Sequence, residues 1–241
     1  MSPADGRAVL FDIDGTLVDT NYLHALAWRR VFLGRGEPEI TTARIHRLVG
    51  MGSDQLVETL CGRPRPELKE DRAREFDALK GEIRALPRAA ALLRAVHDRG
   101  VGVVLATSAE KSDLDALLAV LDADDAIDAV TSAGDVEQAK PEPDIFMTAL
   151  EEAGTAPEAT VVVGDTVWDV EAAARAGLRC VAVTSGGICR AELEAAGALV
   201  VYDDVAALLD ELEDSPLLGG GAQSASTSGG TTTASSSRRT E

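Results

Sequence analysis

Two aspartates, Asp12 and Asp14, stand two residues apart where an apolar run ends, in the stretch AVLFDIDGTLVDT from Ala8 to Thr20. Carboxylates placed this close together repel one another unless a cation lies among them, and hard oxygen ligands of this kind suit Mg²⁺. A carboxylate can also act as a nucleophile toward phosphorus and form an aspartyl-phosphate. The spacing therefore points to metal-assisted chemistry, provided that further charged groups join the pair.

Three later segments also supply polar side chains: two stand where apolar runs end, and one lies in the segment after the third run. The side chains are those of Thr107, Ser108, Lys140, Asp165 and Asp169. Because the carboxyl ends of parallel strands meet at one edge of a sheet, we expect four carboxylates, a hydroxyl pair and an ammonium in one cleft. A metal site beside an anion site is typical of enzymes that catalyse phosphoryl transfer. Catalysis of this reaction consists mostly of positioning the substrate and neutralising its charge.

The elements that must position these groups are six apolar runs that alternate with helical patterns. Most runs are continuous rather than alternating, which indicates strands that are buried on both faces. Strand–helix–strand alternation predicts a parallel sheet with right-handed crossovers, in a doubly wound, Rossmann-like α/β core. The predicted strands are Ala8–Asp14, Val101–Ser108, Ala129–Ser132, Thr160–Asp165, Cys180–Thr184 and Leu199–Tyr202.

One region breaks this alternation, because residues 20–86 show helical patterns and no convincing strand. We interpret them as an all-helical cap inserted into an α/β core of residues 1–19 and 87–214, above the carboxyl ends of the strands. Asp19 is the predicted N-cap of the first cap helix. Residues 215–241 are rich in Gly, Ser and Thr, and we expect them to be disordered.

The bulk composition narrows the classes of partner. A formal net charge of -18 argues against nucleic acid or an anionic membrane as the main partner, since both require basic patches. Small phosphorylated substrates remain compatible, because one local positive site suffices for them. The three cysteines lack a metal-type spacing, and no secretion signal or membrane-spanning run is visible, so we expect a cytoplasmic protein, monomeric or homodimeric.

Four motifs together resemble those of the haloacid dehalogenase superfamily. They are DxDGT at Asp12–Thr16, a strand ending at Thr107–Ser108, Lys140 in KPEP and GDTxxD at Gly164–Asp169. They occur in order, and the resemblance extends from about Ala8 to Asp204. Each motif alone is weak, whereas four in order form a specific pattern. The helical insertion after the first motif resembles the type 1 cap of phosphoglycolate-phosphatase-like and β-phosphoglucomutase-like members.

The resemblance implies roles for the acidic residues. Asp12 is the expected nucleophile, and Asp14 is the expected acid for the leaving oxygen and then the base for the hydrolytic water. Mg²⁺ is expected between Asp12, the backbone carbonyl of Asp14 and Asp165, with Asp169 as a supporting carboxylate.

The resemblance also implies an anion site. Thr107 and Lys140 are expected to hold the phosphoryl group, with the backbone of Ser108 assisting. Thr16 is expected to set the conformation of the first motif's loop, and Gly15 to permit it.

Two residues of the cap are candidates for contact with the substrate. His24 and Trp28 are four residues apart and share one helical face, which either faces the cleft or packs at the junction of cap and core. The resemblance places His24 where some sugar-phosphate mutases carry a histidine important for cap closure. The TSGG segment, Thr184–Gly187, is interpreted as a structural turn.

The leading hypothesis is a Mg²⁺-dependent phosphatase that acts on a phosphoglycolate-like or sugar-phosphate monoester. A β-phosphoglucomutase-like mutase is the first alternative, although GMGSDQ lacks the arginine that mutases tend to carry there. A haloacid dehalogenase would need neither a metal nor Asp14. A non-enzymatic phospho-receiver would be about half this size and would lack the helical insertion. The cap residues match no substrate pattern, so the substrate is left open.

Overall fold

The computed structural model describes residues 6–219, and its centre is a six-stranded parallel sheet. The strands lie in the order β3-β2-β1-β4-β5-β6, so the doubly wound topology predicted from the sequence is confirmed. Five strands fall within the apolar runs predicted for them, and β5 begins one residue before its predicted run, at Arg179. The strands are β1 (Ala8–Phe11), β2 (Gly102–Ala106), β3 (Ala129–Thr131), β4 (Thr160–Gly164), β5 (Arg179–Val183) and β6 (Val200–Tyr202).

The central strand β1 aligns the ends of its two neighbours. Phe11 at the end of β1 pairs with Leu105 of β2 on one side and with Val163 of β4 on the other. All four residues of β1 are buried, as the continuous apolar run predicts for an inner strand. This register brings the segments that follow β1, β2 and β4 to one edge of the sheet.

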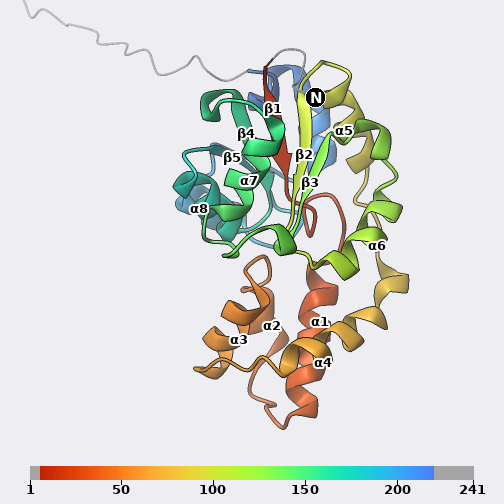
Figure 1. Ribbon diagram of the computed structural model, residues 1–241, viewed down its shortest axis with the longest axis vertical. Helices are drawn as coiled ribbons and strands as arrows, with labels where there is room; N and C mark the ends of the chain where they lie inside the picture. The colour runs from red at the N-terminus through yellow and green to blue at the C-terminus, as the bar shows by residue number, and fades with distance from the viewer. Residues whose placement is uncertain (1–5, 220–241) are drawn as a thin grey trace, which may run out of the picture.

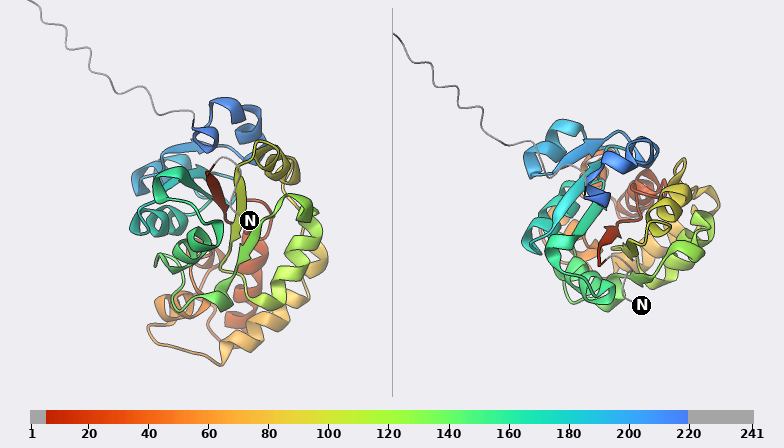
Figure 2. Two further views of the ribbon diagram at one scale, coloured as in Figure 1. Left: turned by 45° about the horizontal axis from the view of Figure 1, so that its top comes forward. Right: turned by 90° about the horizontal axis from the view of Figure 1, so that it is seen from above.

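Helices cover both faces of the sheet (Figure 2). Because side chains alternate along a strand, Val9 and Phe11 join one apolar cluster while Ala8 and Leu10 join the other. The first face carries α5 (Ala89–His97), α6 (Lys111–Leu121) and α10 (Val205–Asp210). The second face carries α7 (Asp144–Ala153), α8 (Val167–Arg175) and α9 (Arg190–Ala196).

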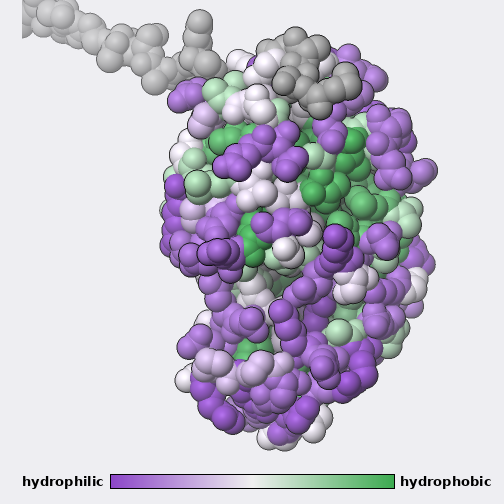
Figure 3. Space-filling model, viewed as in Figure 1, coloured by the Kyte–Doolittle hydropathy of each residue, from purple (hydrophilic) through white to green (hydrophobic). Residues whose placement is uncertain are grey.

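A separate group of helices follows β1 and lies beyond the edge at which the strand ends (Figure 1). These helices have an apolar cluster of their own, which includes Trp28, Phe32 and Leu56. On the face seen in Figure 3, the molecule narrows between this group and the sheet. The group consists of α1 (Asn21–Gly34), α2 (Thr42–His46), α3 (Ser53–Cys61), α4 (Leu68–Asp77) and the 3-10 turn η1 (Lys80–Glu82).

The chain enters and leaves this group at neighbouring points. Val18 and Ala85 form an antiparallel bridge, and the N–H of Leu86 donates to the carbonyl of Leu17 at 2.8 Å. The two connecting segments therefore run side by side.

Two local expectations are corrected. Thr20, not Asp19, occupies the N-cap position of α1. The Thr20 hydroxyl donates to Asp14 instead of capping the helix, and Asp19 is exposed. Disorder does not begin at Ser215: this residue is buried, and Leu217 joins the apolar cluster on one face of the sheet. The rest of the predicted disordered tail, residues 220–241, lies outside the described residues.

Short 3-10 turns make up the remaining elements. In residues 6–219, no helix has both the length and the apolar character required to cross a bilayer. The turns are η2 (Asp124–Ala126), η3 (Ala133–Asp135), η4 (Pro157–Ala159), η5 (Leu212–Asp214) and η6 (Pro216–Leu218).

Candidate active site

A buried ammonium joins two of the predicted carboxylates. The Nζ of Lys140 lies 2.5 Å from Asp12 Oδ1 and 2.7 Å from Asp169 Oδ1, and it donates to the carbonyl of Ala106 at 3.3 Å. Lys140 is 1% exposed and Asp12 6% exposed, so the pairing takes place away from bulk water. The segments after β1, β3 and β4 thus meet as the parallel sheet predicts.

Asp165 completes a group of three carboxylates. It is fully buried, and it accepts hydrogen bonds from Thr16 Oγ1 at 3.1 Å and from Asn21 Nδ2 at 2.7 Å. One oxygen from each of Asp12, Asp165 and Asp169 lies within 4.8 Å of the others. The side chain of Asp14 is not part of this group.

The pKa values of these carboxyls show how little positive charge the protein itself supplies. Burial, reinforced by Asp169 and Asp14, raises the pKa of Asp12 to about 8 even though Lys140 opposes the shift. Burial and the charges of Asp169 and Asp12 raise the pKa of Asp165 well above its usual value. One ammonium does not balance three carboxylates. The all-oxygen donor set fits a hard divalent cation such as Mg²⁺.

Asp14 turns away from this group toward the helices after β1. Its Oδ1 accepts from the Thr20 hydroxyl at 2.5 Å and from His24 Nε2 at 3.1 Å, and the Thr107 hydroxyl lies 3.5 Å from Oδ2. Burial favours a raised pKa for Asp14. The hydrogen bonds from His24 and Thr20, together with the charge of Arg72, outweigh burial and lower the pKa. The two neighbouring aspartates are therefore tuned in opposite directions.

His24 connects Asp14 to the far side of the cleft. Its Nδ1 lies 2.6 Å from an amino nitrogen of Arg72 on α4. A guanidinium group can only donate, so Nδ1 accepts and the Nε2–H of His24 is donated to Asp14. Arg72 in turn donates to Asp113 of α6 at 2.9 Å. Four side chains thus form a continuous polar path from the end of β1 to the core helix α6.

His24 and Trp28 were expected either to face the cleft or to pack at the junction of cap and core. Both side chains line a small cavity of about 50 Å³ together with Asp12 and Asp14. His24 contacts Asp14, whereas Trp28 is 3% exposed and belongs to the apolar cluster of the helical group. His24 therefore faces the cleft with a polar contact, and Trp28 forms part of its apolar wall.

The hydroxyl pair after β2 divides between core and helical group. Thr107 is buried, and its Oγ1 accepts from the Ala109 N–H at 3.0 Å. The Ser108 hydroxyl donates across the cleft to the carbonyl of Gly50 at 3.3 Å. The helical group is thus in contact with the sheet edge, in a closed arrangement.

Sequence reasoning missed the TSGG turn as part of the site. The carbonyl of Gly186 accepts from Asn21 Nδ2 at 3.2 Å and from His46 Nε2 at 2.9 Å. A Cβ at Gly186 would lie 1.6 Å from Asp165 Oδ2, so only glycine allows the turn to approach the carboxylates. Ser185 Oγ also donates to the carbonyl of Gly15 at 2.7 Å.

Asn21, Thr20, Arg72 and Asp113 were also missed. No local pattern marks them, because Arg72 and Asp113 are 41 residues apart and Asn21 and Gly186 are 165 residues apart. From sequence alone, a polar residue at a helix start, such as Thr20 or Asn21, is first interpreted as a helix cap.

Comparison with known proteins places this geometry in a family. The family model of haloacid dehalogenase-like hydrolases matches residues 7–177. The chain is 32% identical over 219 residues to a phosphorylated carbohydrates phosphatase from Thermotoga maritima, covering 86% of this chain and 99% of that one. It is 30% identical over 224 residues to a phosphoglycolate phosphatase from Pseudomonas putida, covering 86% and 80%.

A solved structure agrees with these sequence relationships. A hydrolase from Pseudomonas syringae matches with a TM-score of 0.81 at 33% identity, covering 86% of this chain and 98% of that one. Residues 7–177, which the family model matches, contain all of the buried charged groups described above. The chain belongs to the haloacid dehalogenase-like hydrolase family.

Proposed function

We propose that the protein is a Mg²⁺-dependent phosphatase that hydrolyses a small phosphorylated metabolite through an aspartyl-phosphate on Asp12. The names of its relatives, a phosphorylated carbohydrates phosphatase and a phosphoglycolate phosphatase, support this reaction class. The observation that carries the proposal is the contrast between Asp12, paired with Lys140 among carboxylates, and Asp14, held separately by Thr20 and His24.

The first half-reaction uses both aspartates. Lys140 holds Oδ1 of Asp12, which leaves Oδ2 to attack phosphorus. The new bond joins Asp12 to phosphorus while the bond from phosphorus to the leaving oxygen breaks, and that oxygen takes a proton from Asp14. In this proposal, the anionic phosphoryl group of the bound substrate raises the pKa of Asp14 and so opposes the lowering seen in the free protein. Thr107 and Lys140 hold the phosphoryl oxygens, and Ser108 contributes its backbone N–H. Fixed donors of this kind stabilise the charge that develops in the transition state.

The second half-reaction returns the enzyme to its starting state. Asp14, now a carboxylate, takes a proton from a water molecule that attacks the phosphorus. The bond between Asp12 and phosphorus breaks, and inorganic phosphate leaves. The Nε2–H of His24 and the hydroxyl of Thr20 orient the Asp14 carboxyl in both steps.

The residues that would hold Mg²⁺ are Asp12, Asp165 and the backbone carbonyl of Asp14, with Asp169 supporting them. A bound divalent cation supplies the positive charge that Lys140 alone does not, and this keeps Asp12 ionised at neutral pH. Gly15, at φ +78, lets the loop turn toward Asp165, and the Thr16 hydroxyl fixes one oxygen of that carboxylate.

Residues 20–86, in this proposal, are the cap that closes over the phosphoryl group and carries the contacts to the leaving group. The proposed setting is the cytoplasm, with the protein acting as a monomer or homodimer. Neither nucleic acid nor a membrane is a proposed partner.

The test is phosphate release from a panel of phosphorylated metabolites, with Mg²⁺ and after treatment with EDTA. We expect turnover that EDTA abolishes and Mg²⁺ restores. Asp12→Asn should lower turnover by about a thousand-fold or more. Asp98→Asn, at an exposed position, is the matched control and should act as wild type.

Other outcomes would replace the proposal. Conversion of glucose 1-phosphate to the 6-phosphate without phosphate release would indicate a mutase. Halide release from a 2-haloacid in the presence of EDTA would indicate a dehalogenase. Full activity in Asp12→Asn would remove the proposed nucleophile.

A further inference from the structure

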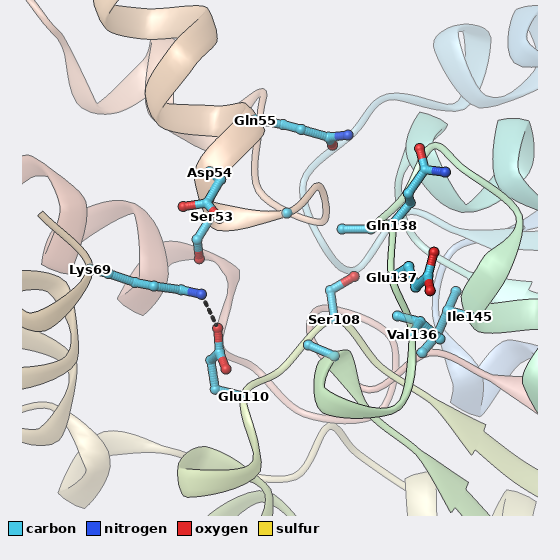
Figure 4. Close-up of a pocket in the computed structure, with 13 residues that line it drawn as sticks. Ser53, Asp54, Gln55, Lys69, Ser108, Glu110, Val136, Glu137, Gln138 and Ile145 are labelled. Atoms are coloured by element: carbon cyan, nitrogen blue, oxygen red, sulfur yellow. Dashed lines mark ion pairs between the residues drawn. The ribbon is translucent and has the colours of Figure 1, made fainter. Parts of the chain in front are cut away.

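A larger cavity, of about 300 Å³ (Figure 4), lies beside the small one that Asp12 and Asp14 help to line. Ser53, Ser108 and Glu110 line both cavities, so the larger one continues from the smaller. Small-molecule pockets start at roughly 300 Å³. The larger cavity is therefore where the part of the substrate beyond the phosphoryl group would lie.

The lining of the larger cavity is acidic. Asp54, Glu110 and Glu137 contribute three carboxylates, and Lys69 contributes the single cation found among the described lining residues. Lys69 is already paired with Glu110 at 3.1 Å, across the junction of α4 and the core (Figure 4). The lining thus has a formal excess of two negative charges, which would repel a second anionic group on the substrate.

Apart from the paired Lys69, the start of helix α3 is the feature of the described lining that would favour an anion. Its first residues, Gly52 to Gln55, line the cavity, and the N–H groups at a helix start attract negative charge. Asp54 lies in that first turn, and its carboxylate offsets the helix dipole. The acidic character of the lining therefore remains.

The uncharged groups of the lining are suited to hydroxyls and amines. Gln55 Oε1 is buried and has no hydrogen-bond partner among the described residues. A buried acceptor without a partner is costly, and a donor on the ligand would satisfy it. In Figure 4, the Gln55 side chain extends from α3 toward the segment that carries Gln138, and the Ser53 and Ser108 hydroxyls lie below.

We propose that this cavity selects phosphate monoesters whose leaving group is an uncharged or amine-bearing polyol, and that it disfavours leaving groups with a carboxylate or a second phosphate. Sugar and amino-sugar monophosphates satisfy the requirement, whereas phosphoglycolate and sugar bisphosphates do not. The inference rests on the proposed function, because it specifies the leaving group of that reaction.

The test compares three substrates of similar size that differ in charge. They are glucosamine 6-phosphate, glucose 6-phosphate and 6-phosphogluconate, which carry an ammonium, no further charge and a carboxylate. We expect kcat/KM to be lowest for 6-phosphogluconate, by at least about tenfold, and to be highest for one of the other two. A value for 6-phosphogluconate equal to or above the others would overturn the inference.

Variants of the lining locate the source of the selection. Glu110→Gln removes one carboxylate and frees Lys69, so the disadvantage of 6-phosphogluconate should shrink several-fold. Glu137→Gln should act in the same direction. Glu158→Gln removes an equal charge next to the start of β4, at the opposite edge of the sheet, and should leave the ratio unchanged. An unchanged ratio in both lining variants would contradict the inference.

Binding separates this inference from the proposed function. Calorimetry on the Asp12→Asn protein measures the Kd of the same three compounds without turnover. The expected order of affinity is the same as for kcat/KM. If wild type releases no phosphate from any compound but the order of Kd holds, the function fails and the selectivity stands. If phosphate is released and 6-phosphogluconate binds best, the selectivity fails and the function stands.

Discussion

Asp12 and Asp14 are separated by one residue, yet they belong to two contrasting halves of the site. The half around Asp12 is built mainly from core segments: Lys140 joins Asp12 and Asp169 in the dry interior, and Asn21 of α1 reaches only Asp165. The half around Asp14 depends on the helical group, since His24 comes from α1 and Arg72 from α4. The proposed nucleophile, Asp12, is therefore held by core side chains, whereas the proposed acid and base, Asp14, also depends on side chains of α1 and α4.

The contrast also separates two physical tasks. The core half holds charge in a low-dielectric environment and gains from rigidity. The geometry of the other half depends on the contact between the helical group and the core, because Arg72 of α4 donates to Asp113 of α6. Damage to the first half should affect stability and catalysis together, and damage to the second should affect catalysis more.

The largest effect is expected from Lys140→Met in the core half. Loss of the ammonium leaves Asp12 and Asp169 buried without a counter-charge, and breaking a buried pair costs about 3 to 5 kcal/mol of unfolding free energy. Turnover should also fall by about a thousand-fold. Urea unfolding and phosphate release measure the two effects. Lys111→Met, at an exposed position, is the control. A stable and active Lys140→Met protein would contradict the description of this half.

A smaller and more selective effect is expected from Asp113→Asn in the other half. Arg72 loses its carboxylate partner, and the misplacement reaches Asp14 through His24, so kcat should fall by about ten- to a hundred-fold. Alkyl phosphates should suffer more than p-nitrophenyl phosphate, because a poor leaving group depends more on the acid. Asp115→Asn, exposed on the same helix, is the control. Equal losses for both kinds of leaving group would show that Asp113 acts only structurally.

A several-fold effect is expected from Gly52→Ala, which acts on the junction without touching either aspartate. The new Cβ would lie 2.5 Å from that of Ala139, so the helical group must move away from the core. We expect kcat to fall about threefold to tenfold, with thermal stability nearly unchanged. Gly34→Ala, which has open space around it, is the matched control. Wild-type kcat in Gly52→Ala would mean that close contact here is unnecessary.

The smallest effect on turnover is expected far from both halves, at the C-terminal end of the described chain. A protein that ends at Gly219 should match wild type in kcat and in Tm. A protein that ends at Asp214 also loses the buried Leu217, and it should be about 2 to 4 kcal/mol less stable with unchanged kcat per folded molecule. Thermal unfolding and active-site titration check both proteins. A large loss of kcat in the protein that ends at Gly219 would contradict the expectation that residues after Gly219 do not affect turnover.

The same contrast explains how much could be predicted from sequence. The six strands and the groups around Asp12 follow from local patterns, because parallel strands bring their ends together in a predictable way. The path from His24 through Arg72 to Asp113 depends on how two helices pack across a junction, and no local pattern encodes that distance. The TSGG segment is a turn, as predicted, but its approach to Asp165 was not foreseen, because glycines allow a close approach as well as a turn.

The paired connections at Val18 and Ala85 have a consequence for how such a protein can diverge. The chain leaves the core and returns to it at adjacent positions. The intervening helices are therefore an insertion whose two ends meet the core at a fixed separation. Their length and sequence can be exchanged without altering the register of the sheet. New recognition surfaces can therefore be acquired over an unchanged reaction centre, and substrate preference is expected to evolve faster than chemistry in this architecture.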